Sequence, residues 1–99
     1  MIKHIVIFTF KSFECHAERH AAIQEIKNEL EALLGVVPSL KEIEVGINSN
    51  PKEGNDLVLT TLFDDMAGLN AYAVHPAHQA VASKIGAIKI ARACVDYEI

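Results

Sequence analysis

The chain has 99 residues, of which 51% are hydrophobic and 22% are charged, and its formal net charge is −4. A chain of this length forms one domain, 1–99, and an acidic balance without a basic cluster excludes electrostatic capture of nucleic acid or of an anionic membrane. The two cysteines, Cys15 and Cys94, form no CxxC motif, and we expect both to be free thiols. The first residues show neither a cleavable leader nor an apolar run long enough to span a membrane, so we expect a cytoplasmic protein.

The first predicted element is a strand over 2–10, within MIKHIVIFTF, which is rich in β-branched and aromatic residues. Alternation divides the apolar residues between two faces, with Ile5 and Ile7 on one face and His4 on the other together with Ile2, Val6, Phe8 and Phe10. Because both faces are apolar, we expect this strand to be covered on both sides.

A helix is predicted next, over 15–34. Its apolar residues recur at steps of three and four along the chain and form one stripe: Ile23, Ile26, Leu30 and Leu33. Gly35 and Pro38 are residue types that end a helix, so we expect the chain to leave the helix there.

Two strands follow this helix. The alternation in SLKEIEVGIN predicts a half-exposed strand over 40–48, and NSNPKEGND supplies the turn residues of a loop. The segment LVLTTLF predicts a strand over 56–63 that is apolar on both faces and therefore central in its sheet.

The chain then forms two short helical segments. Either Asp64 or Asp65 is expected to cap the first segment, which continues through Tyr72. Pro76 lacks an amide hydrogen and interrupts this helix, so a second piece over 77–86 follows it.

The last predicted strand covers 89–98, which completes the order βαββαβ of an α+β, ferredoxin-like domain with a four-stranded antiparallel sheet. Two helices shield only one face of such a sheet, yet its central strands are apolar on both faces. We therefore expect a homodimer in which two copies pair sheet to sheet. A charge at Val6, or at Ile7 if the opposite face is the uncovered one, is expected to split this dimer or to unfold the chain.

Five segments carry a resemblance along essentially the whole chain: KHIVIFTFK, VPSLKEIEVGIN, DLVLTTLFDD, YAVHPAHQAV and RACVDYEI. Taken in order, they resemble the stress-responsive A/B barrel (Dabb) domain family of the dimeric α/β barrel superfamily. The resemblance implies the ferredoxin-like fold, paired into a β-barrel at the dimer interface. Most members of this family have no established activity, some plant members are stress-associated structural proteins, and one plant member is a polyketide cyclase.

That cyclase closes a linear polyketide by an aldol-type condensation without a cofactor. The resemblance implies that its catalytic tyrosine and histidine correspond to Tyr72 and His78, within YAVHPAH, and that its strand-one histidine corresponds to His4. A further pocket histidine of the cyclase is replaced here by Leu57, a departure that weakens the transfer of the activity but not of the fold.

Tyr72 and His78 would lie about 120° apart on an unbroken helix, because six residues turn about 600° at roughly 3.6 residues per turn. The break at Pro76 lets both side chains face one cavity between helix and sheet. There His78 can act as a base, and Tyr72 can donate a hydrogen bond to a developing enolate oxygen. The alternative is that Tyr72 is a core residue with its hydroxyl at the rim, and His78 a capping or surface group.

Three more residues are candidates for ligand binding. His75 either serves the same site or caps the helix end before Pro76. His4 is either a cavity residue or a hydrogen-bonded core group. Arg92 shares a strand face with Asp96 and pairs either with that carboxylate or with an anionic ligand, while Asp96 itself is interpreted as structural.

We expect no metal site and no cofactor. The HxxH spacing of His75 and His78 lacks the third and fourth ligands that zinc needs, and His16 and His20, near Cys15, are better explained as a solvated helix start. The chain contains no GxGxxG, GxxxxGK[ST] or GxSxG motif, so nucleotide-dependent and serine-hydrolase chemistry have no support.

The sequence therefore predicts a small homodimer that holds a small, partly apolar molecule in a cavity between sheet and helices. If the protein is an enzyme, it is a cofactor-independent cyclase, isomerase or lyase that acts beside a carbonyl group. The alternative is a non-catalytic stress-response or structural dimer with a filled, dry core.

Overall fold

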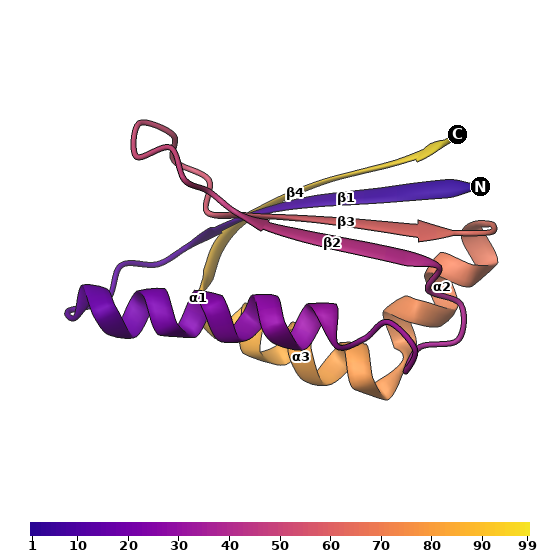
Figure 1. The fold of residues 1–99 in the computed structure, drawn as a ribbon, viewed down its shortest axis with the longest axis horizontal. Helices are drawn as coiled ribbons and strands as arrows, with labels where there is room; N and C mark the ends of the chain where they lie inside the picture. The colour runs from indigo at the N-terminus through magenta and orange to yellow at the C-terminus, as the bar shows by residue number, and fades with distance from the viewer.

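The computed structural model describes residues 1–99, which form a four-stranded sheet with three helices against one of its faces (Figure 1). The elements in chain order are β1 (Ile2–Phe10), α1 (His16–Glu31), β2 (Glu42–Ile47), β3 (Leu57–Phe63), α2 (Met66–Val74), α3 (Pro76–Ile88) and β4 (Lys89–Glu98). The strands are antiparallel in the order β2-β3-β1-β4, so β1 and β3 are central. The predicted ferredoxin-like fold is confirmed.

The element boundaries agree with the prediction to within two residues, except at the end of the first helix. α1 ends at Glu31, earlier than expected, and turns carry the chain to Gly35, whose φ of 88° lies in the left-handed region that favours glycine. β2 is shorter than predicted at both ends. None of the helices is both long and apolar enough to cross a membrane.

The hydrophobic core lies between the sheet and the helices. Alternate residues of β1 enter it, and Val6 is only 1% exposed. The predicted stripe of α1 packs against them, since all four of its members are buried: Ile23, Ile26, Leu30 and Leu33. His4 lies on this same covered face of β1 and is also buried.

The opposite face of the sheet is uncovered and largely apolar. The register places Ile7 beside Val58 of β3 and Ile5 beside Val95 of β4, so these side chains share the face away from the helices. Ile7 is 36% exposed and Val58 38%. Of the two alternatives, Val6 belongs to the core, where a charge is expected to unfold the chain, and Ile7 lies on the uncovered face, where a charge is expected to split a dimer.

The cap of α2 provides a test of how local interactions stabilise the fold. Asp65 is the N-cap, and its Oδ1 accepts a hydrogen bond of 2.8 Å from the Gly68 amide, whereas Asp64 makes an exposed ion pair of 3.3 Å with Lys41. We expect Asp65→Ala to lower the free energy of unfolding by about 1 kcal/mol. Asp64→Ala should lower it by roughly 0.5 kcal/mol or less. Urea denaturation of both variants measures this, and equal losses would contradict the assignment of the cap.

Candidate functional site

A cavity of about 310 Å³ lies between the sheet and helices α2 and α3. Most of its lining is apolar, and its polar residues include His4, Tyr72, His78, Arg92 and Asp96. The volume lies at the lower end of the range of ligand pockets, about 300–1,000 Å³, so the cavity suits a small molecule.

The break between α2 and α3 positions the cavity side chains of this segment. His75 has an extended backbone, and its Nδ1 accepts a 3.1 Å hydrogen bond from the Ala77 amide, so it is the N-cap of α3. Pro76 follows at the first position of α3, where its missing amide hydrogen costs no helical hydrogen bond. Of the two predicted roles for His75, the structure shows the cap, and this residue does not line the cavity.

The same break brings His78 onto Tyr72. The two ring centroids are 4.3 Å apart, so the side chains converge as predicted. The carbonyl oxygen of Ala73, near the end of α2, lies 3.1 Å from His78 Nδ1. A carbonyl only accepts, so Nδ1 carries the hydrogen and donates it, which leaves Nε2 with a free lone pair.

Burial controls the protonation of both side chains. Burial lowers the pKa of His78, the hydrogen bond to Ala73 partly offsets this effect, and the charges of His4 and Arg92 lower the pKa further. Burial also raises the pKa of Tyr72 to about 12. At neutral pH the site therefore holds a neutral imidazole beside a protonated hydroxyl, which are the states that a base and a hydrogen-bond donor require.

The Tyr72 hydroxyl has no partner in the chain. Tyr72 is 1% exposed, its ring packs 5.1 Å from the Phe63 ring, and its buried oxygen makes no hydrogen bond. Buried polar groups are normally paired, and an unpaired one costs about 1–3 kcal/mol. The site thus contains a buried donor for which the protein supplies no acceptor.

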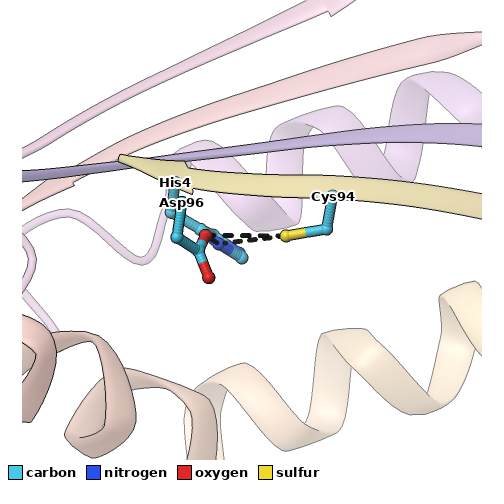
Figure 2. Close-up of side chains that lie close together, drawn as sticks. All are labelled: His4, Cys94 and Asp96. Atoms are coloured by element: carbon cyan, nitrogen blue, oxygen red, sulfur yellow. Dashed lines mark hydrogen bonds and ion pairs between the residues drawn. The ribbon is translucent and has the colours of Figure 1, made fainter. Parts of the chain in front are cut away.

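A second polar cluster lies on the same side of the sheet (Figure 2). His4 Nδ1 is hydrogen-bonded to Asp96 Oδ1, and Cys94 Sγ lies 3.5 Å from each of these two atoms. The three side chains point from β1 and β4 toward the helices, and the His4 ring centroid is 6.5 Å from that of Tyr72. Burial, and then the charge of Asp96, raises the pKa of the Cys94 thiol.

Arg92 does not pair with Asp96, because that carboxylate is bound to His4 instead. Arg92 makes no ion pair with any carboxylate, and its exposed side chain lines the cavity together with Lys89. The predicted pairing of Arg92 with Asp96 is therefore wrong, and the pairing with an anionic ligand stays a prediction.

Comparison with known proteins places this fold in a family. Residues 2–99 match the model of the Stress responsive A/B Barrel Domain family. The chain belongs to this family. This A/B barrel domain is 24% identical over 80 residues to olivetolic acid cyclase from Cannabis sativa, a match that spans 78% of this chain and 75% of that enzyme.

Solved structures share the same fold. A dimeric protein of unknown function from Bacteroides fragilis has a TM-score of 0.93 at 36% identity, over 99% of this chain and 95% of that one. The hydroxynitrile lyase from Passiflora edulis has a TM-score of 0.81 at 19% identity, over 99% of this chain and 92% of that one. The fold thus occurs in a protein described as dimeric and in one named as a lyase.

Two candidates of the sequence analysis lie away from the cavity of this A/B barrel domain. Leu57 is 2% exposed in the core beside Phe8 and does not line the cavity. His75 caps α3, as described above. Conversely, Asp96 was predicted only as a structural residue and Cys94 only as a free thiol, although their alternation with Arg92 along one strand places all three on one face.

The protonation of His78 can be tested directly. We expect its pKa to lie below 6.5, because burial disfavours the imidazolium, and NMR titration of the ring resonances measures it. The unfolded chain then binds the proton more readily than the folded one, so the free energy of unfolding decreases as the pH falls below about 6.5 and through the folded pKa. His78→Gln should remove this part of the pH dependence, whereas His20→Gln, on the exposed face of α1, should not. A His78 that titrates above pH 6.5 would contradict the expected state.

Proposed function

We propose that this A/B barrel domain is a homodimer that binds a small, partly apolar molecule in its cavity and carries out acid–base chemistry beside a carbonyl group with side chains alone. The observation that carries the proposal is the buried, unpaired hydroxyl of Tyr72 next to the neutral ring of His78. A ligand oxygen in the cavity would supply the acceptor that the protein lacks.

The chemistry follows from the two protonation states. His78 Nε2 accepts a proton from the carbon next to the ligand's carbonyl, and the electron pair of that C–H bond moves into the enolate. The Tyr72 hydroxyl donates a hydrogen bond to the enolate oxygen and keeps its own proton, because its pKa is about 12. The enolate carbon then attacks a second carbonyl or expels a leaving group, and the imidazolium returns its proton to the product.

The charge of the cavity indicates a further feature of the ligand. Arg92 and Lys89 line the cavity without carboxylate partners, in a chain whose net charge is −4. A guanidinium binds a carboxylate through two parallel hydrogen bonds. We therefore infer a carbonyl compound that also carries a carboxylate or a similar anionic group.

Similarity supports this class of reaction over the structural alternative. The relative from Cannabis sativa is named as a cyclase, and the fold also occurs in a hydroxynitrile lyase. A non-catalytic structural dimer does not require an unpaired hydroxyl beside a neutral imidazole. It would instead fill its core with side chains.

Ligand binding and turnover test the proposal. A thermal-shift screen of small keto acids and aromatic acids should find compounds that stabilise the wild type, and that stabilise His78→Ala and Tyr72→Phe less. For a compound that reacts, His78→Ala should lower the rate by about 10²- to 10⁴-fold, because a general base is lost. Tyr72→Phe should lower it less, because only one hydrogen bond is removed and the packing remains.

His20→Ala, on the exposed face of α1, is the control for this screen and should behave as the wild type. Equal thermal shifts in wild type and His78→Ala for every compound that binds would contradict a ligand contact at His78. The absence of any binder would favour the structural dimer.

The dimer is tested at the uncovered sheet face. Ile7→Glu should give a folded monomer, because the charge lies on the apolar face that the second copy would bury. Ala80→Glu, which adds the same charge on the exposed side of α3, should remain dimeric. Light scattering gives the mass and circular dichroism the fold; a wild type that is monomeric at micromolar concentration would contradict the dimer.

A further inference from the structure

His4, Cys94 and Asp96 form the one group of three side chains in this chain whose nitrogen, sulfur and oxygen ligand atoms all lie within 4.8 Å of one another. We propose that these three residues bind a divalent cation of the Zn²⁺ class. Such a site goes beyond the proposed function, in which Tyr72 and His78 carry the chemistry and Arg92 and Lys89 attract the ligand. It also departs from the expectation that the chain holds no metal.

The spacing of the donor atoms fits tetrahedral coordination. Cys94 Sγ lies 3.5 Å from His4 Nδ1 and 3.5 Å from Asp96 Oδ1. Ligand atoms about 2.0–2.3 Å from a tetrahedral Zn²⁺ lie about 3.3–3.8 Å from one another. His4 Nδ1 and Asp96 Oδ1 are closer than this because a hydrogen bond joins them, and the cation would take the place of that bond's proton.

The backbone holds the three ligands in place. His4 on β1 lies directly opposite Asp96 on β4, and the next pair on the same face is Val6 with Cys94. Paired strands fix these positions, so the donor atoms require only side-chain adjustment to meet a cation. Sites built on such regular elements are more precisely positioned than sites on loops.

The chemistry of the donors selects the ion. A thiolate, an imidazole and a carboxylate are the ligands that Zn²⁺ uses, whereas Mg²⁺ and Ca²⁺ prefer oxygen alone. The thiolate and the carboxylate together neutralise two positive charges. Arg92 lines the same cavity, and its side chain is exposed and makes no ion pair with any of the three ligands.

Three protein ligands leave the fourth tetrahedral position open, as in zinc sites that bind water or substrate. The three side chains point toward the helices, and His4 and Asp96 line the cavity that also contains Tyr72 (Figure 2). A cation held here would therefore present its open position to the cavity, where an anionic oxygen of a ligand can complete the coordination.

Titration of the full chain with Co²⁺, under reducing conditions and without any ligand, tests the site. Bound Co²⁺ should give a sulfur-to-cobalt charge-transfer band and intense visible bands of tetrahedral coordination, at one ion per chain, and Zn²⁺ should displace it. Cys94→Ser should abolish the charge-transfer band. Cys15→Ser, which changes the other free cysteine, should keep it.

Asp96→Asn is the second variant, and it should weaken Co²⁺ binding by at least about tenfold, since even indirect supports of a metal site contribute that much. It decides the question if Cys94→Ser does not fold. The proposal is overturned if the wild type shows no charge-transfer band, if Cys94→Ser keeps it, or if Asp96→Asn binds Co²⁺ as tightly as the wild type. None of these readouts depends on turnover, so they stand apart from the test of the proposed function.

Discussion

The absence of an amide hydrogen on Pro76 is the constraint on which the arrangement of the cavity depends. The chain cannot continue α2 through this residue, and His75 closes one helix and caps the next. His78 Nδ1, on α3, donates a hydrogen bond to the carbonyl of Ala73, near the end of α2. One interaction thus turns the His78 ring onto Tyr72 and fixes its tautomer, whereas an unbroken helix would hold the two side chains about 120° apart.

Burial then gives these two side chains opposite and complementary properties. The same desolvation lowers the pKa of the imidazole and raises that of the phenol, because each charged form is disfavoured away from water. Asp96 is paired with His4, so Arg92 has no carboxylate partner in the chain and can bind an anionic ligand in the cavity. The mostly apolar cavity therefore contains the neutral imidazole of His78, the unpaired hydroxyl of Tyr72 and the unpaired guanidinium of Arg92.

Much of this could be predicted from the sequence, because the signals are local. Alternation identified the central strands, the stripe of α1 identified its buried face, and Pro76 identified the break that brings Tyr72 and His78 together. Alternation also divided β1 into two faces, but it could not say which of them the helices cover, so Val6 and Ile7 remained alternatives.

Other features depend on pairings between distant segments. His4 meets Asp96 only because β1 and β4, which lie at opposite ends of the chain, are neighbours in a particular register. The cluster with Cys94 follows from the same register, and the pairing of β1 with β3 places Leu57 opposite Phe8 in the core, outside the residues that line the cavity.

The proposed function requires that a ligand oxygen complete the hydrogen bonding of Tyr72 beside His78. A crystal structure of the wild type with a compound that stabilises it tests this most directly. We expect a ligand oxygen about 2.6–3.2 Å from the Tyr72 hydroxyl, with a carbon of the ligand facing His78 Nε2. A ligand bound outside the cavity, or a Tyr72 hydroxyl paired with a group of the chain, would contradict it.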